Sequence, residues 1–399
     1  MKDKRWDLFA LASIPLMMTL GNSMLIPVLP LMEREMNITS FQSSLIITIY
    51  SVIAIPLIPV FGYLSDKWGR KKIIIPSLIT VAVGGGIATV AAWLMENPYW
   101  LILVGRFIQG IGASGAFPVV IPTVGDMFKD QKEISKGLGI IETANTFGKV
   151  LSPILGALLA VVVWYFPFLF IPVLSLVSIL LVMFLVKVPK DKEEEKKSTI
   201  GQFVKNTKDL IKENKHWIFS VFITGGVLMF VLFGLLFHFS NVLEDDFKKL
   251  GVTKGFYLAV PLLFLCIASY TSGCKIGENK TFMKWMIVAG NSVAALSFLF
   301  VRGDTGLLVF LLLLSVAGAG IGVALPCMDA FITEGIPKEE RGTITSIYSS
   351  IRFVGVAAGP PVIAIFMKEA PGLIYYSFAA LCVVLVLVNW LSLDSSEKS

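Results

Sequence analysis

Long apolar runs separated by short polar turns make up most of the chain. Twelve runs of 18 residues or more carry few charges, at about residues 7–32, 41–61, 73–94, 99–122, 137–162, 166–187, 217–240, 255–273, 283–301, 305–328, 342–367 and 371–392. A helix of about 20 apolar residues crosses the roughly 30 Å of bilayer hydrocarbon. The strands of a membrane barrel would instead alternate in polarity over about ten residues. The pattern therefore predicts an all-α membrane protein with twelve transmembrane helices.

One long polar stretch divides these twelve runs into two sets of six. It covers residues 188–216 and contains the charge run KDKEEEKK at 190–197. We therefore expect three parts, which are an N-terminal six-helix bundle over 1–187, a cytoplasmic linker over 188–216 and a C-terminal six-helix bundle over 217–399.

The two sets of six runs resemble each other in sequence. Residues 109–118 read QGIGASGAFP and residues 317–326 read AGAGIGVALP, so their first two glycines and final proline align at an offset of 208. The pair Gly148 and Pro153 recurs as Gly355 and Pro360 at an offset of 207. Small residues at helical spacing allow close helix packing in lipid, so one match alone would be ordinary. Two matches predict pseudo-symmetric halves, and such halves place a substrate site between them.

Lysine and arginine predict the orientation in the membrane. With the N-terminus inside, the cytoplasmic segments hold 25 of these residues and the external segments hold 6. Cytoplasmic loops carry the excess of positive charge in membrane proteins. We therefore expect a multi-pass protein of the cell membrane with both termini in the cytoplasm, and we assign the net charge of +6 to topology rather than to nucleic-acid binding.

Composition argues against an enzyme. Hydrophobic residues make up 55% of the chain and charged residues 16%, and there are two histidines. We find no Ser/His/Asp arrangement, no metal-ligand spacing and no phosphate-binding loop of the kind that ATP-driven pumps need. We expect no cofactor and no metal, and we expect the chain to function as a monomer.

Three motifs carry a resemblance to a known family. Residues 62–72 read GYLSDKWGRKK, residues 106–112 read RFIQGIG, and residues 148–156 read GKVLSPILG. Together they resemble the major facilitator superfamily, in particular its twelve-span drug:proton antiporter branch, and the resemblance covers the whole chain. It implies the two-bundle facilitator fold and proton-coupled efflux by alternating access.

The resemblance assigns two mechanical roles. The turn would act as a gating loop that latches the halves together, through Gly62, Asp66, Gly69, Arg70 and Lys71. The alternative is a basic turn that only sets topology. The second role is a hinge formed by Gly148, Ser152, Pro153 and Gly156, with Gly355 and Pro360 as counterparts in the other half. Without the resemblance, a routine proline-kinked helix explains this second pattern equally well.

Four ionisable residues lie inside predicted spans, and such residues are costly and usually functional. They are Arg106, Glu142, Lys149 and Arg352. The family's usual acid in the middle of the first span is missing, since residues 21–24 read GNSM. We therefore predict that Glu142, Arg106 and Asp66 take part in proton coupling. Arg106 could instead be a structural tie to Asn22 or to backbone carbonyls, and Glu142 a static partner of an embedded cation.

Three embedded cations against one acid indicate a neutral, zwitterionic or anionic amphiphile as substrate. The candidate substrate-binding residues are Lys149, Arg352, Asn22, Asn145, Met229 and Phe233. The leading hypothesis is a proton-coupled exporter of small amphiphilic compounds, comparable to multidrug efflux and multidrug resistance antiporters. One alternative is a dedicated exporter of an endogenous anionic metabolite, such as a siderophore or a lipid-linked precursor. Another is a non-transporting sensor or lipid flippase on the same fold. The expected partners are a small-molecule substrate, protons and the lipid bilayer.

Overall fold

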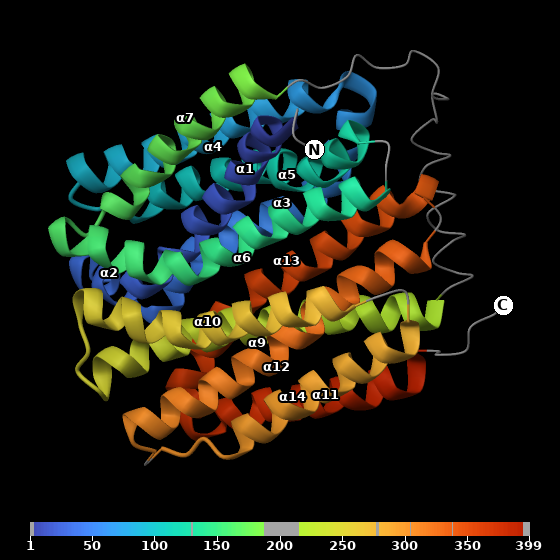
Figure 1. Cartoon of the computed structure of the whole chain (residues 1–399). Helices are drawn as coiled ribbons and strands as arrows, with labels where there is room; N and C mark the ends of the chain where they lie inside the picture. Colours follow the sequence, from blue (N-terminus) through green and yellow to red (C-terminus); the bar gives the residue numbers. More distant parts are fainter. Residues whose placement is uncertain are drawn as a thin grey trace. The chain divides into compact units, whose positions relative to one another are not determined.

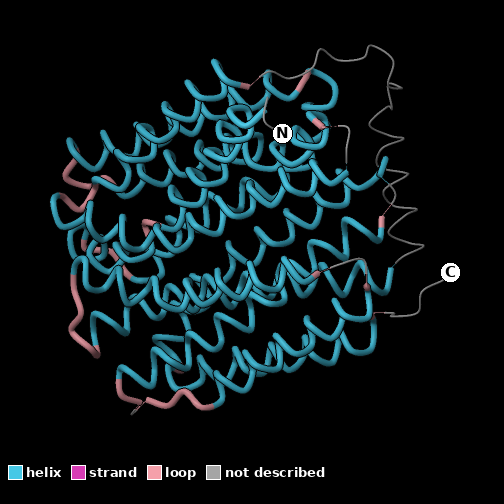
Figure 2. Tube along the Cα trace, viewed as in Figure 1, coloured by secondary structure: helices cyan, strands magenta, loops and turns pink. Residues whose placement is uncertain are grey.

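A computed structural model describes residues 4–128, 131–186, 215–276, 279–303, 305–336 and 338–393, which are almost entirely helical (Figures 1 and 2). The first set of helices is α1 (Arg5–Ser23), η2 (Ile26–Val28), α2 (Leu29–Met36), α3 (Ser40–Trp68), α4 (Arg70–Leu94), α5 (Tyr99–Met127), α6 (Gln131–Val162) and α7 (Phe166–Leu185). The second is α9 (Lys215–Asp245), α10 (Gly251–Lys275), α11 (Lys280–Leu299), α12 (Leu307–Gly335), α13 (Lys338–Glu369), η3 (Pro371–Leu373) and α14 (Ile374–Ser392). Most of the predicted linker lies outside the described residues.

Twelve of the described helical segments are long and apolar enough to span a membrane, which confirms the predicted all-α class and number of spans. Large apolar side chains remain exposed along them, including Trp100 (74%), Phe184 (73%) and Leu391 (77%). Exposed apolar faces on this scale suit contact with lipid rather than water. The chain is therefore a multi-pass membrane protein.

The first span differs from the prediction of one continuous helix. Its helix α1 ends at Ser23, a short 3-10 segment follows, and α2 begins at Leu29. Pro27 and Pro30 have no N–H to donate along the helix, which weakens the regular hydrogen bonding in this stretch. Helix α3 stays continuous through Pro56 and Pro59, so two prolines at this spacing do not by themselves predict a break.

Several helices extend beyond their apolar runs. Helix α3 continues seven residues past the predicted end at 61 to reach Trp68, and α9 continues from the predicted 240 to Asp245. The apolar run marks the part of a helix in hydrocarbon, whereas backbone hydrogen bonds continue into the polar zone. Helix α3 also starts with a capping box. The backbone N–H of Gln42 donates to Thr39 Oγ1, and the backbone N–H of Thr39 donates to the side-chain oxygen Oε1 of Gln42.

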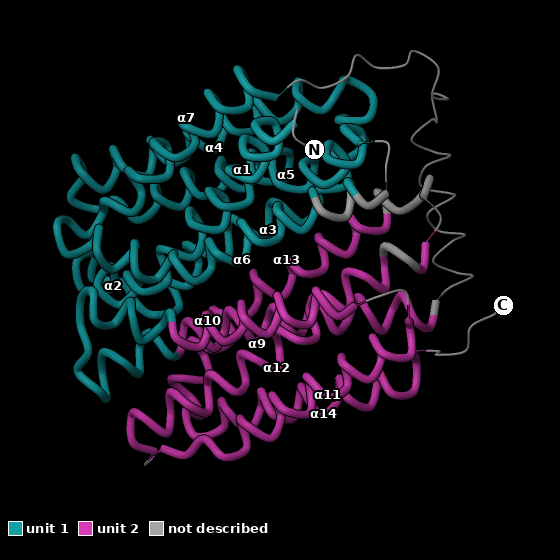
Figure 3. Tube along the Cα trace, in the orientation of Figure 1, with its two compact units in different colours: residues 1–196, 239–259 teal, residues 197–238, 260–399 magenta. Residues whose placement is uncertain are grey.

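The described chain divides into two compact units (Figure 3). Unit 1 contains the first six spans together with Phe239–Ala259, which is the tip joining α9 to α10. Unit 2 contains Lys197–His238 and Val260–Ser399. Residues 239–259 thus belong to unit 1, although they follow the predicted linker in the sequence.

The repeated glycines make equivalent contacts inside each unit. In unit 1, a Cβ added to Gly112 would collide with the Ser77 carbonyl of α4. In unit 2, a Cβ on the matching Gly320 would collide with the Gly290 carbonyl of α11. Since α5 meets α4 as α12 meets α11, the sequence repeat corresponds to a repeat of helix packing.

Candidate functional site

The predicted loop over 62–72 is a single-residue turn. Helix α3 runs to Trp68, α4 starts at Arg70, and Gly69 between them has φ 96° and ψ 140°. A residue with a side chain is strained at this positive φ, so glycine is required here. Gly62, which the sequence analysis places in the gating loop, lies within α3, and its carbonyl accepts the Ser65 hydroxyl at 2.7 Å. Backbone hydrogen bonding simply continues through the polar residues.

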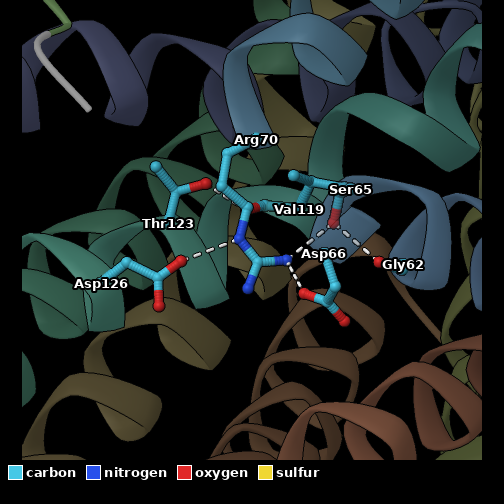
Figure 4. Close-up of polar contacts among 7 residues, drawn as sticks. All are labelled: Gly62, Ser65, Asp66, Arg70, Val119, Thr123 and Asp126. Carbon is cyan, nitrogen blue, oxygen red and sulfur yellow. Dashed lines mark hydrogen bonds and ion pairs between the residues drawn. The ribbon is translucent and has the colours of Figure 1, made fainter. Parts of the chain in front are cut away.

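Arg70 is the centre of a polar network beside this turn (Figure 4). Its Nη1 donates to Ser65 Oγ at 2.7 Å and forms an ion pair with Asp66. Its Nε donates to Asp126 Oδ2 at 2.9 Å. The arginine side chain is 14% exposed, whereas the two carboxylates are 60% and 51% exposed. One cation therefore ties the end of α3 to the end of α5 at the surface.

Two contacts of this turn were not predicted. Asp126 lies in the last turn of α5, where the helix dipole disfavours an acid, and Arg70 compensates for that charge. Lys71 donates to the carbonyls of Met183 and Val186 at the end of α7, at 2.8 and 3.1 Å. A cation at the C-terminal end of a helix is favoured by the same dipole. Lys71 thus fixes α4 to α7.

Arg106 is fully buried in α5 and makes several polar contacts. Its Nε donates to the Ile46 carbonyl at 2.8 Å, Nη1 donates to Gln109 Oε1 at 2.5 Å, and Nη2 donates to Asn22 Oδ1. Its guanidinium also lies 4.5 Å from the centre of the Tyr50 ring. The structure thus contains the tie to Asn22 that the sequence suggested, and it connects α1, α3 and α5. Participation in proton coupling stays a prediction.

Glu142 of α6 lies in a group of polar side chains that extends to α1. Asn145 Nδ2 donates to the Glu142 carboxylate oxygens at 3.2 and 3.3 Å, and Thr146 Oγ1 lies 3.4 Å from Oε1. Thr19 Oγ1 donates to Asn145 Oδ1 at 2.5 Å, so Asn145 joins the acid to α1. Glu142 and Lys149 are both partly exposed on α6. The carboxylate therefore accepts hydrogen bonds from the neutral side chains of Asn145 and Thr146.

The predicted hinge face of α6 packs closely on α1. A Cβ on Gly156 would collide with the Met24 carbonyl, and one on Gly148 would lie 3.2 Å from the Leu16 carbonyl. Pro153 cannot donate to the Lys149 carbonyl four residues before it. Ser152 supplies the missing donor, because its Oγ donates to that carbonyl at 2.9 Å. The serine thus repairs the hydrogen bond that the proline removes.

Unit 2 carries the counterparts of this face. A Cβ on Gly355 would collide with the Gly226 carbonyl of α9, and Pro360 lies inside α13. The aromatic and methionine candidates Met229 and Phe233 lie on α9 and are only 3% and 8% exposed. They are part of the packed interior in this structure.

Arg352 of α13 faces Asp329 of α12. Its Nη1 lies 3.4 Å from Asp329 Oδ1, and the two side chains are 20% and 37% exposed. The guanidinium also lies 5.5 Å from the centre of the Tyr348 ring, one turn earlier on α13. This embedded arginine is therefore more accessible than Arg106.

Unit 1 contains a buried ion cluster that was not predicted from the sequence, at the end that the charge count assigns to the outside. Glu244 of α9 pairs through Oε2 with Lys254 of α10 at 2.8 Å and through Oε1 with Arg34 of α2. The Glu244 and Lys254 side chains are 6% and 3% exposed, and Arg34 is 57% exposed. Beside them, Glu33 accepts from Ser40 and Ser43 at 2.7 and 2.6 Å. The signal was an acid and a base ten residues apart around a short polar turn.

The described residues contain no group of three or more His, Cys, Asp or Glu side chains that could hold a metal ion. What they do contain are charged and amide side chains within the spans of each unit, on α1, α5 and α6 of unit 1 and on α12 and α13 of unit 2.

Three comparisons with known proteins bear on this arrangement. The sequence model of the Major Facilitator Superfamily matches residues 11–360 and again residues 279–399. The bacillibactin exporter of Bacillus subtilis (strain 168) is 50% identical over 394 residues, which cover 98% of this chain and 97% of the relative. The class B tetracycline resistance protein of Escherichia coli is 24% identical over 378 residues, covering 90% and 87%.

Solved structures show the same fold at low sequence identity. The human organic anion transporter MFSD10 superposes with a TM-score of 0.77 at 17% identity, over 97% of this chain and 99% of the other. A D-xylose-proton symporter superposes with a TM-score of 0.78 at 13% identity, over 98% of both chains. At such identities the likeness concerns the fold alone.

Proposed function

Because the chain belongs to the major facilitator superfamily, we propose that it exports an iron-free siderophore in exchange for protons by alternating access. The observation that carries the proposal is the 50% identity to a bacillibactin exporter over nearly the full length of both chains. Of the two export hypotheses drawn from the sequence, the proposal favours the dedicated exporter of an endogenous metabolite. The multidrug exporter was the leading hypothesis from the sequence alone.

The embedded charges support an oxygen-rich anionic substrate. Siderophores bind iron through oxygen donors that are anionic or readily ionised, and guanidinium and ammonium groups recognise such oxygens. We assign substrate contacts to Lys149 and Arg352, and secondary contacts to the amides of Asn22 and Asn145. Met229 and Phe233 would contribute apolar contact where the helices separate during transport.

We assign the proton to Glu142. Its carboxylate is partly exposed on α6 and is held by the neutral donors of Asn145 and Thr146, so it can gain or lose a proton without breaking an ion pair with them. Arg106 and Asp66 remain supporting candidates for coupling. The Arg70 turn serves as the conformational latch and the Gly148–Gly156 face as the hinge.

The charge distribution supports a place in the cell membrane with both termini in the cytoplasm. In this orientation the Arg70 turn faces the cytoplasm and the Glu244 cluster faces outward. We also retain a division into bundles over 1–187 and 217–399 with a linker over 188–216. The chain would function as a monomer.

Drug efflux is the second candidate function. It is favoured by the likeness to tetracycline resistance proteins at 24–26% identity. The lower identity makes it the weaker of the two, and the partly exposed cation Arg352 suits anions better than cationic drugs.

Inverted membrane vesicles containing the protein provide the test. With an acidic interior, addition of iron-free bacillibactin should release protons, as read by a pH-sensitive dye, and labelled siderophore should accumulate. Glu142→Gln should abolish the proton release while siderophore exchange at equal pH continues. Proton release with tetracycline but not with the siderophore would instead establish drug efflux.

A further inference from the structure

The two embedded arginines differ in what a substrate could reach. Arg106 is 0% exposed, and each nitrogen of its guanidinium donates to an oxygen of α1, α3 or α5. A substrate could bind it only by displacing these buried contacts. Arg352 is partly exposed, which leaves it as the arginine that can recognise a ligand without disrupting the core.

The pair that Arg352 forms with Asp329 is suited to exchange. Its Nη1–Oδ1 distance of 3.4 Å is longer than the roughly 2.7–2.9 Å of a strong charge-assisted hydrogen bond. Asp329 is also 37% exposed, so water can solvate its carboxylate once a substrate anion has replaced it at the arginine. A competing anion with a shorter contact to Nη1 can therefore replace the Asp329 oxygen at this nitrogen.

The aromatic ring of Tyr348 fixes the position of the Arg352 guanidinium. The guanidinium lies 5.5 Å from the centre of the Tyr348 ring, and that ring stacks on Phe222 of α9 at 6.1 Å. Tyr348 is 2% exposed, and a Cβ on Gly225 would collide with its ring. The ring is therefore held firmly, and a cation over an aromatic face gains further stabilisation. The charge of Arg352 stays in place while its anionic partner changes.

We propose that Asp329 is the counter-ion of Arg352 in the empty transporter. When the substrate binds, its anionic oxygens replace Asp329 at the guanidinium, and the pair between Asp329 and Arg352 forms again when the substrate leaves. The proposal rests on the proposed export of a siderophore and names the residue that sets its affinity. A charge within a membrane span is costly without a partner, even when its side chain is partly exposed. Asp329 provides that partner in the empty transporter, so it weakens substrate binding and speeds substrate release.

The role predicts opposite effects on binding and turnover. Asp329→Asn keeps the side-chain size but removes the competing charge, so KM for iron-free bacillibactin should fall several-fold and kcat should fall as well. Arg352→Gln should raise KM at least several-fold. The double variant should match Arg352→Gln, since Asp329 acts through the arginine. Glu369→Gln, an exposed acid of the same unit, is the matched control and should change neither constant.

A binding readout separates this inference from the function. Benzoate, an aromatic carboxylate, should raise the melting temperature of the purified protein at lower concentration in Asp329→Asn than in wild type, and not in Arg352→Gln. This holds whether or not the siderophore is the substrate, whereas wild-type vesicles without siderophore flux would overturn the proposed function alone. Unchanged or weaker benzoate binding in Asp329→Asn would overturn the inference. So would loss of proton-driven export with siderophore exchange intact, because Asp329 would then be a proton carrier.

Discussion

Two ion networks of unit 1 have opposite charge arrangements. At the turn between α3 and α4, one cation, Arg70, holds two acids. In the Glu244 cluster one acid, Glu244, holds two cations, Arg34 and Lys254. The acids of the first network are 60% and 51% exposed, whereas Glu244 and Lys254 are 6% and 3% exposed. Both networks are ion pairs, but the first lies largely in contact with solvent and the second is buried in the protein.

This difference in exposure separates a network that can break from one that must stay formed. Exposed ion pairs contribute about 0–1 kcal/mol, because water solvates the separated charges well. A buried charge that loses its partner is destabilised much more strongly. The Arg70 network thus suits a latch that opens in every transport cycle. The Glu244–Lys254 pair suits a permanent brace at the tip joining α9 and α10.

Glu244→Gln should have the largest effect on stability. It removes the carboxylate that pairs with the buried ammonium of Lys254, and breaking a buried pair in this way costs about 3–5 kcal/mol. The melting temperature of the detergent-purified protein should fall markedly, as measured by intrinsic fluorescence. A variant as stable as wild type would show that water reaches the pair and would remove the contrast between the two networks.

Replacing both members of the buried pair should restore most of that loss. In Glu244→Met with Lys254→Met no charge remains to be desolvated, and such replacements are neutral or stabilising by about 1–4 kcal/mol relative to the ion pair. The double variant should therefore melt close to wild type and well above Glu244→Gln. If it melts as low as the single variant, the cluster stabilises by packing rather than by charge.

Arg70→Ala should change stability by about 1 kcal/mol or less, since both of its carboxylate partners are largely in water. Its effect should instead appear as a several-fold fall in the rate of siderophore export from vesicles. Lys72→Ala, an exposed cation of the same turn, is the matched control and should leave the rate unchanged. Equal rates in the two variants would favour the topological interpretation of the turn over the latch.

Arg34→Ala should have the smallest effect on stability. The Arg34 side chain is 57% exposed, and Glu244 still forms its ion pair with Lys254 in this variant. We expect a loss of about 0.2–0.5 kcal/mol at low salt, and less in 1 M salt, where screening is nearly complete. Melting curves at the two salt concentrations test this. A loss that does not depend on salt would place Arg34 in the buried part of the cluster.

The sequence predicted those features that depend on local patterns. Hydropathy predicted the twelve spans. The tie between Arg106 and Asn22 was one of two interpretations left open for this arginine, and it rested on the cost of a lone charge in lipid. The Glu244 cluster was missed because α9 and α10 extend beyond their apolar runs, so Glu244 and Lys254 were assigned to a loop. Asp126 was missed because its link to Arg70 joins residues 56 apart, a separation that no local pattern reveals.

Ser152 matters before the helices have packed together. A membrane segment enters the lipid while its neighbours are still absent, and an unsatisfied carbonyl there costs several kcal/mol. The bond from Ser152 to the Lys149 carbonyl lies within α6 and needs no other helix, so it forms during insertion. Glycine at this position would leave that carbonyl bare in hydrocarbon until assembly was complete. The serine therefore makes the proline-containing span easier to insert, independently of any part it has in transport.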